Sequence, residues 1–231
     1  WGVPEVPEKA GKTAVEMFQA AADGEIRALW ISCTNPAQSM PDQRTVRRAL
    51  EKCELVIVQE AFSTTATCDY ADLLLPATTW GEKVGTVTNS ERRISRVRPA
   101  VPAPGEARHD WSAAADFARR LGAMLPARGA AGPLFPYALD SEAGAVAIWN
   151  EHRESTRGRD LDITGLSWSL LDSDGPQQWP LPQGQAQGRQ RLYEDGVFPT
   201  PHGRARFFAA PYKPTADEPE ARYPFSLKTR R

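Results

Sequence analysis

The sequence has little of what metal, redox and disulfide sites are built from. Its three cysteines and three histidines stand far apart: Cys33, Cys53, Cys68, His109, His152 and His202. No C-x-x-C pair occurs, so we do not expect this chain to hold a zinc or iron–sulfur site by itself. The cysteines are also too few and too scattered for a disulfide framework, and they are interpreted as small buried apolar side chains.

The sequence also lacks an excess of charge of one sign, and it lacks long apolar runs. Lys and Arg number 28 against 29 Asp and Glu, which leaves a net charge of −1. This balance gives no electrostatic footprint for nucleic acid or an anionic membrane. No apolar run approaches the roughly 18 residues that indicate a membrane span. The hydrophobic fraction of 41% and charged fraction of 25% are ordinary for a globular protein.

The common catalytic motifs are absent from the sequence. It contains no G-x-S-x-G, no G-x-x-x-x-G-K-[ST], no G-x-G-x-x-G and no H-E-x-x-H. We therefore predict no catalytic residue and no metal ligand in this chain. The sequence starts at Trp1 and ends in Leu-Lys-Thr-Arg-Arg, and we expect both ends to be cuts through a longer polypeptide. A missing signal peptide is then uninformative.

Three short apolar runs predict strands buried on both faces, at residues 28–31, 55–58 and 73–75, the last stopped by Pro76. Helical spacing of apolar residues predicts helices over 12–22, stopped by Gly24, and over 42–52 with Asp42 as N-cap. Strand and helix in alternation predict an α/β fold with a doubly wound, mostly parallel sheet.

Further along the chain we expect a hairpin within residues 80–98 and a helix from Asp110, its N-cap, to Met124. Alanine, glycine and proline accumulate over 126–136, which indicates a domain edge. We therefore predict an α/β domain over residues 1–125. An irregular connecting arm is predicted after it, over 126–222, with a helix near 141–152.

Polar residues follow the predicted strands directly. Because ligands of such sheets bind beyond the carboxyl ends of the strands, Asn35 and the pair Gln59 and Glu60 are candidate contacts. These residue types suit a nucleotide. A carboxylate from Glu60 or Asp110 can accept both donors of the guanine edge. Gln59 and Asn35 can donate to a ring carbonyl or a phosphate, and Lys83 can neutralise a diphosphate.

Each candidate also has a plainer interpretation. Asp110 can be only an N-cap, and Lys83 only a free surface charge. Asn35 is part of a polar loop that Pro36 is expected to keep extended. The position of several polar groups at strand ends, rather than any one of them, carries the prediction.

Four stretches resemble a known family. Residues 35–42 read N-P-A-Q-S-M-P-D and residues 70–77 read Y-A-D-L-L-L-P-A. Residues 80–93 read W-G-E-K-V-G-T-V-T-N-S-E-R-R, and 104–111 continue the match with P-G-E-A-R-H-D-W. These segments resemble molybdopterin oxidoreductases of the DMSO reductase type, in particular assimilatory nitrate reductases and related formate dehydrogenases.

The resemblance implies molybdenum held between two molybdopterin guanine dinucleotides, one of which an α/β domain embraces. It places cofactor contacts on five residues of this sequence: Asn35, Gln59, Glu60, Lys83 and Asp110. It also implies that residues 223–231 open a second dinucleotide-binding domain, although Leu-Lys-Thr-Arg-Arg departs from the family's L-N-T-G-R. An iron–sulfur cluster is implied in a part of the parent protein that precedes this chain.

The implied activity is reduction of nitrate to nitrite by a cytoplasmic enzyme that takes electrons from a donor protein or subunit. The chain alone is expected to be inactive. Formate oxidation by a related dehydrogenase is the nearest alternative, and the Thr-Val-Thr-Asn-Ser-Glu-Arg-Arg segment favours the nitrate enzyme. A non-catalytic binding module and a scaffold domain without a ligand are further alternatives.

Overall fold

The computed structural model describes residues 7–125, 135–215 and 218–227. The chain divides into two compact units, Trp1–Gln190 and Arg191–Arg231, and each is considered by itself. The predicted domain edge over 126–136 lies mostly outside the described residues, as do residues 228–231 at the end of the predicted further domain.

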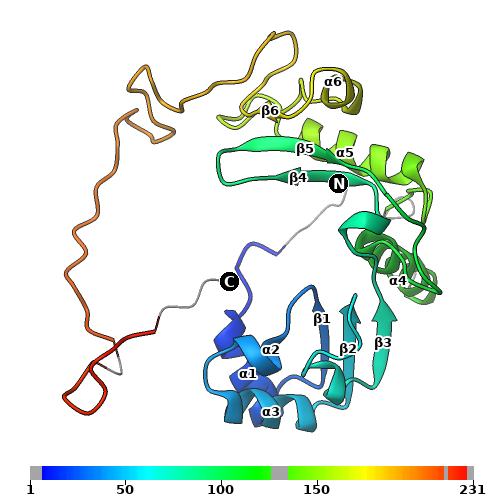
Figure 1. Cartoon of the computed structure of the whole chain (residues 1–231), viewed down its shortest axis with the longest axis vertical. Helices are drawn as coiled ribbons and strands as arrows, with labels where there is room; N and C mark the ends of the chain where they lie inside the picture. Colours follow the sequence, from blue (N-terminus) through cyan, green and yellow to red (C-terminus); the bar gives the residue numbers. More distant parts are fainter. Residues whose placement is uncertain (1–6, 126–134, 216–217, 228–231) are drawn as a thin grey trace. The chain divides into compact units, whose positions relative to one another are not determined.

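The first unit contains a three-stranded parallel sheet (Figure 1). Its strands are β1 (Ala28–Ser32), β2 (Leu55–Glu60) and β3 (Leu73–Pro76), in the order β1-β2-β3. Ser32 pairs with Gln59, and Gln59 in turn pairs with Leu75. The α/β fold and the three parallel strands are as the apolar runs predicted. This register brings the carboxyl ends of all three strands to one edge.

Two helices cover one face of the sheet, α1 (Ala14–Asp23) and α3 (Gln43–Lys52). A capping box of Thr13 and Glu16 starts α1, and Gly24 ends it at a φ of 89°, a conformation that favours glycine. Asp42 caps α3 through its side chain, as predicted. The helices and two strands share a core: Phe18, Ala21, Ala22, Leu29, Ile31, Val46, Ala49, Leu50, Val56 and Val58.

The helix α4 (Asp110–Met124) contacts the opposite face of the sheet. Side chains alternate along a strand, so Trp30 points away from the core that Leu29 and Ile31 enter. The Trp30 ring packs edge-on against Phe117 of α4, with 5.1 Å between ring centroids. Helices therefore lie on both faces, as a doubly wound arrangement requires.

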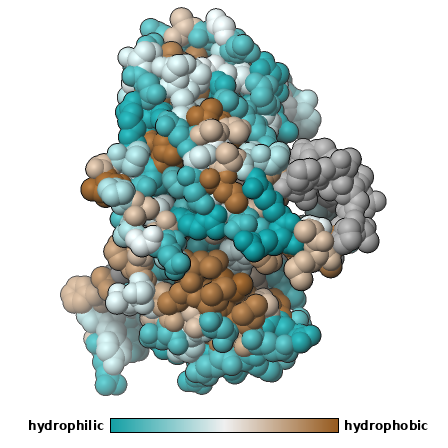
Figure 2. Space-filling view, turned by 90° about the vertical axis from the view of Figure 1, so that its right-hand side faces the viewer, coloured by the Kyte–Doolittle hydropathy of each residue, from teal (hydrophilic) through white to brown (hydrophobic). Residues whose placement is uncertain are grey.

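The prediction that all three strands are buried on both faces is wrong for β3. Leu73 and Leu74 are 46% and 44% exposed. No side chain of β3 belongs to the core that α1 and α3 form with β1 and β2, so these two leucines lack that cover. Figure 2 shows apolar side chains gathered on the side of the molecule that carries β3.

A second, antiparallel sheet follows in the chain. The predicted hairpin is confirmed as β4 (Gly85–Thr88) and β5 (Arg93–Val97), and β6 (Gln177–Gln178) adds a third strand beside β5. The sequence gives no sign of β6 because two residues carry no periodicity. The hairpin thus receives a strand from the segment predicted to be an irregular arm.

Residues of that segment also build a second core around the hairpin. The predicted helix near 141–152 is confirmed as α5 (Glu142–Ser155), and a short helix, α6 (Trp168–Ser173), was not predicted. The buried members of this core come mostly from these helices and the loops beside them: Ile94, Ala145, Trp149, Ile163, Leu166, Trp168, Leu171 and Leu181. This part of the chain therefore packs on the hairpin.

Three single turns complete the described part of the unit: α2 (Pro36–Ser39), η1 (Cys68–Tyr70) and η2 (Trp80–Glu82). The prediction that Pro36 keeps its loop extended is wrong. Proline occupies the first position of α2, where its missing N–H costs no hydrogen bond and its fixed φ suits a helix.

The second unit has little regular structure in the residues that are described. One isolated bridge joins Glu220 and Tyr223, and Phe207 and Phe225 are almost fully exposed. Over the described parts of both units, no helix combines the length and the apolar character needed to cross a membrane.

Candidate functional site

A cavity of about 400 Å³ lies at the carboxyl edge of the parallel sheet. Its walls come from the ends of β1 and β2, from residues 77–83 after β3, and from the start of α4. Four of the five predicted contacts line it: Gln59, Glu60, Lys83 and Asp110. Of these, the strand-end rule had selected Gln59 and Glu60, and the fold brings Gln59 together with Asp110, 51 residues further along the chain.

Asp110 is the hub of the cavity wall. Its Oδ1 accepts a hydrogen bond from Nε2 of Gln59 at 3.0 Å and a weaker one from Sγ of Cys33 at 3.5 Å. Its Oδ2 forms an ion pair with Nζ of Lys83 at 3.0 Å. The carboxylate thus ties the ends of β1 and β2 to the segment after β3.

The predicted N-cap role of Asp110 is wrong. His109 is the N-cap of α4 and makes no side-chain capping bond, while Asp110 is the first helical residue. At that position a carboxylate still interacts favourably with the helix dipole. Its side chain is directed to Gln59 and Lys83 instead of the helix backbone.

Burial and these partners shift the pKa of Asp110 in opposite directions. Burial alone would raise the pKa of its carboxyl group, but the hydrogen bonds from Lys83 and Gln59 and the charge of Lys83 hold this pKa below the usual value. Asp110 is therefore ionised at neutral pH. For Cys33, burial first and the negative charge of Asp110 second raise the pKa of the thiol, which keeps it protonated at neutral pH.

Gln59 is almost completely buried, and its amide is fully engaged on both sides. Its Oε1 accepts from Nε1 of Trp30 at 3.3 Å, and its Nε2 donates to both the backbone carbonyl and the carboxylate of Asp110. Because every bond has a defined donor, the side chain is held in one orientation. Gln59 therefore forms a rigid part of the floor of the cavity.

Glu60 lies at the end of β2 and closes the turn that follows. Its Oε1 accepts hydrogen bonds from the backbone N–H groups of Ala61 at 2.8 Å and Phe62 at 3.4 Å. This local bonding fixes the carboxylate at the cavity wall.

The predicted contact Asn35 does not line the cavity. Its Oδ1 accepts from the backbone N–H of Thr67 at 3.2 Å and from the Thr67 hydroxyl at 2.6 Å. Its Nδ2 donates to Oε1 of Gln38 at 2.9 Å. Asn35 thus joins the loop after β1 to the loop before η1.

Aromatic side chains stand at the rim of the same cavity. Trp80 and Phe62 both line it and are both more than half exposed. Nζ of Lys83 lies 5.3 Å from the centroid of the Trp80 ring, within the range of a cation–π contact. The rim combines a cation with exposed ring surface, which suits a ligand that has both a charged and a planar part.

Seven residues of the wall were not selected from the sequence, among them Cys33, Thr78 and Thr79. The two threonines follow β3 after one intervening residue, Ala77, so the strand-end rule that selected Gln59 would have found them. The interpretation of the cysteines as buried holds for Cys68, but Cys33 is exposed and Cys53 is half-buried. Cys33 also has a φ of 59°, a left-handed conformation that is uncommon outside glycine.

Thr78 differs from the other polar groups of the wall. Its residue surface is 2% exposed, yet in the described part of the chain its hydroxyl has no hydrogen-bond partner. Its backbone N–H donates to the carbonyl of Arg108 at 3.0 Å, and the N–H of Arg108 donates to the carbonyl of Pro76 at 3.0 Å. The chain thus leaves the sheet edge after β3 and returns beside it before α4.

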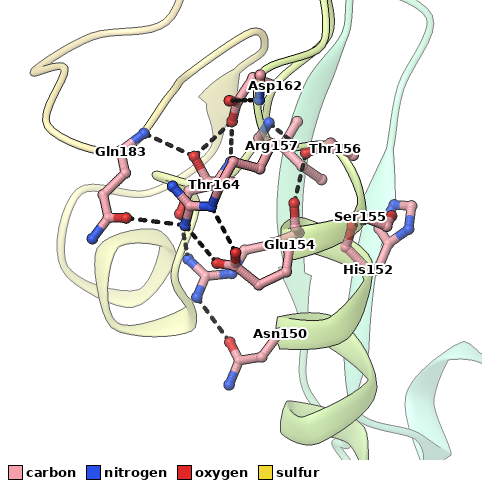
Figure 3. Close-up of polar contacts among 12 residues, drawn as sticks. Asn150, His152, Glu154, Ser155, Thr156, Arg157, Asp162, Thr164 and Gln183 are labelled. Carbon is pink, nitrogen blue, oxygen red and sulfur yellow. Dashed lines mark hydrogen bonds and ion pairs between the residues drawn. The ribbon is translucent and has the colours of Figure 1, made fainter. Parts of the chain in front are cut away.

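A wider cavity of about 700 Å³ lies beside the end of α5. Several of its polar residues, Glu154, Thr164 and Gln183, belong to a network of hydrogen bonds and ion pairs that Figure 3 shows. Arg157 pairs with Glu154 at 2.8 Å, and Thr164 donates to Asp162 at 2.6 Å while accepting from the N–H of Gln183 at 2.9 Å. This network stabilises the turn between α5 and α6. Among the described residues no group of three or more His, Cys, Asp or Glu could hold a metal ion.

The fold and the first cavity define a class: a parallel α/β domain with a polar, cation-bearing cavity at the carboxyl edge, the usual place for a nucleotide. A model of the molybdopterin oxidoreductase family matches residues 3–120. The chain belongs to this family.

Relatives in the family are considerably longer than this chain. Nitrate reductase from Synechocystis is 39% identical over 221 residues, 94% of this chain and 29% of the relative. The assimilatory nitrate reductase catalytic subunit of Bacillus subtilis is 35% identical over 235 residues, 100% of this chain and 31% of the relative. The F420-dependent formate dehydrogenase subunit alpha of Methanocaldococcus jannaschii is 35% identical over 222 residues, 96% of this chain and 30% of the relative.

Among solved structures, acetylene hydratase from Pelobacter acetylenicus is similar with a TM-score of 0.56 and 20% identity, over 82% of this chain and 23% of that chain. At this identity the likeness supports the fold alone. The mixed α/β architecture with a parallel sheet is therefore one that a solved protein also has.

Proposed function

We propose that the cavity at the sheet edge binds one molybdopterin guanine dinucleotide, and that the protein containing this chain reduces nitrate to nitrite. The observation that carries the first part is the Lys83–Asp110–Gln59 arrangement at the carboxyl edge of the sheet. The second part rests on the family and on the nitrate reductases to which the chain is similar over nearly its whole length.

The residues present fit such a cofactor. The cavity volume of about 400 Å³ falls within the range of roughly 300–1,000 Å³ for small-molecule sites. Lys83 carries three N–H donors, and within the described residues Asp110 takes one of them, so donors remain for a diphosphate. The exposed Trp80 ring offers a stacking surface for a planar base.

In this proposal each predicted residue has a defined task. Lys83 binds the diphosphate, and Glu60 accepts the two donors of the guanine edge. Asp110 keeps Lys83 and Gln59 in place at the wall while its own charge is balanced. Asn35 acts from outside the cavity by holding the loop after β1 against Thr67.

The bound molybdenum centre would supply two-electron oxygen-atom transfer, while the residues of this chain bind and orient the dinucleotide. We propose that residues 1–125 form the cofactor-embracing domain, 126–222 the connecting arm, and 223–231 the start of a second dinucleotide-binding domain. An iron–sulfur cluster elsewhere in the enzyme would pass electrons from a donor protein or subunit. The similarity to assimilatory enzymes supports a cytoplasmic location.

Formate oxidation is the second candidate, because the chain is 35% identical to a formate dehydrogenase subunit over 96% of its length. The full-length protein is expected to reduce nitrate with a reduced viologen as donor, and to leave formate unoxidised. The reverse pattern would assign it to the dehydrogenases and would leave the cofactor proposal intact.

The cofactor proposal is tested by measuring the molybdenum and guanine nucleotide contents of the purified protein. The purified full-length protein is expected to contain molybdenum and to release GMP on acid hydrolysis. In Lys83→Met both contents are expected to fall together, since the diphosphate loses its cation. Lys12→Met is the matched control because Lys12 makes only an exposed ion pair with Glu25 at 3.5 Å. Unchanged contents in Lys83→Met would show that the cavity does not hold the dinucleotide.

A further inference from the structure

Thr78 has an unusual combination of burial and missing hydrogen bonds. Its hydroxyl is buried and lacks a partner among the described residues, which costs free energy in a folded protein. Two other buried threonines show the normal situation. The Thr67 hydroxyl donates to Asn35 at 2.6 Å, and the Thr164 hydroxyl donates to Asp162 at 2.6 Å.

The position of Thr78 indicates a ligand in the cavity as the partner of its hydroxyl. Thr78 lines the same cavity as Lys83 and Gln59, two residues after the end of β3. Its backbone is fixed by the bond from its N–H to the carbonyl of Arg108. A rotation about χ1 exchanges the hydroxyl and the methyl group without moving that backbone, so the hydroxyl can turn to a ligand at the wall.

The side chains of the cavity wall indicate which ligand atom the Thr78 hydroxyl contacts. Lys83 supplies the positive charge of the cavity. Within the described residues, its ion pair with Asp110 already balances part of this charge. A diphosphate held by Lys83 carries more acceptor oxygens than one ammonium group can serve. A hydroxyl on the same wall adds a neutral donor without adding charge, and a hydrogen bond to an anion is stronger than one to a neutral group.

We propose that the hydroxyl of Thr78 donates a hydrogen bond to a diphosphate oxygen of the nucleotide in this cavity, beside Lys83. This inference rests on the proposed function of the cavity. The unsatisfied hydroxyl then destabilises the ligand-free protein, and nucleotide binding removes this destabilisation. Stability and affinity consequently depend on Thr78 in opposite directions.

The test uses the 231-residue chain with GDP and guanosine as probes, followed by calorimetry and thermal unfolding. In Thr78→Val the melting temperature of the ligand-free protein is expected to stay equal or rise, while GDP affinity falls about tenfold. Guanosine affinity is expected to stay unchanged, because guanosine lacks the diphosphate. Thr78→Ser keeps the hydroxyl and is expected to bind GDP about as well as the wild type.

Thr164→Val is the matched control. It removes a buried hydroxyl that has partners and does not line this cavity, so it is expected to lower the melting temperature and leave GDP affinity unchanged. Equal GDP binding by wild type and Thr78→Val would overturn the inference alone. If guanosine affinity fell as much as GDP affinity in Thr78→Val, the contact would not be with the diphosphate, and the inference would be overturned as well. A wild-type chain that binds neither probe would remove both the inference and the proposed site.

Discussion

Lys83 and Asp110 form a largely buried ion pair, with Nζ 3.0 Å from Oδ2 and side chains that are 23% and 30% exposed. The pair joins the residue after η2 to the first residue of α4. Because Asp110 also accepts from Gln59 at the end of β2, it links the parallel sheet to the segment that carries the cation. The geometry of the cavity therefore depends on a single carboxylate.

Replacing that carboxylate is expected to destabilise the protein. Asp110→Asn removes the charge and places an amide donor against Lys83 or Gln59, so at least one donor loses its acceptor. We expect the free energy of unfolding to fall by about 1–3 kcal/mol. Urea denaturation followed by circular dichroism measures this. A loss below about 0.5 kcal/mol, the range of an ordinary surface substitution, would contradict the role of Asp110.

The same substitution is expected to change the reactivity of Cys33. Burial and the charge of Asp110 both raise the pKa of this thiol, and Asp110→Asn removes the second cause. We expect Cys33 to react about two- to threefold faster with iodoacetamide at pH 8, since the thiolate is the nucleophile. Mass spectrometry of the labelled peptides measures the rate, and Cys53 is an internal control because Asp72, not Asp110, acts on it. Equal acceleration of both cysteines would indicate general loosening.

His109 is expected to make stability depend on pH. Burial lowers its pKa below 6.5, although the charges of Asp140 and Asp110 act in the other direction. The unfolded state therefore binds more protons, and stability falls as the pH drops from 6.5 through the folded pKa. Asn is a good N-cap that cannot titrate, so His109→Asn is expected to flatten this slope. Melting temperatures measured in this range check it, and identical slopes for both proteins would refute the assignment.

The second core is expected to depend on Arg96, whose side chain is only 4% exposed. Its guanidinium carbon lies 3.5 Å from the centroid of the Trp168 ring, and the group donates to Gly85 and Asp172 at 3.0 and 3.1 Å. Arg96→Met is expected to cost about 2–3 kcal/mol of unfolding free energy. Arg98→Met is the control. Arg98 also pairs with Asp172 but is exposed, so its loss should cost less than about 1 kcal/mol.

Much of the fold could be predicted from the sequence because its strands and longer helices have clear periods. The apolar runs located β1, β2 and β3, and Gly24 and Asp42 marked helix ends through their own chemistry. The exposure of β3 could not be predicted, since an apolar run does not show whether a helix covers the strand. Short elements such as β6 gave no signal at all.

The candidate site was predicted in outline. The strand-end rule selected Gln59 and Glu60, but it could not show that Asp110 bonds to Gln59, because that contact spans 51 residues. The partner of Asn35 is Thr67, which lies 32 residues further along the chain, and no sequence motif links the two. The missing partner of the Thr78 hydroxyl is a property of packing, so only a structure reveals it.

The bridge between Ala77 and Arg108 brings two distant points of the chain side by side at the edge of the parallel sheet. The segment between them, which contains η2 and the β4–β5 hairpin, therefore starts and ends at one place beside β3. Lys83 and Trp80 belong to this segment, whereas Gln59 and Asp110 lie outside it. Because the hairpin also pairs with β6 and contributes Ile94 to the second core, a shift of that core would carry the cation and the stacking ring relative to the floor of the cavity.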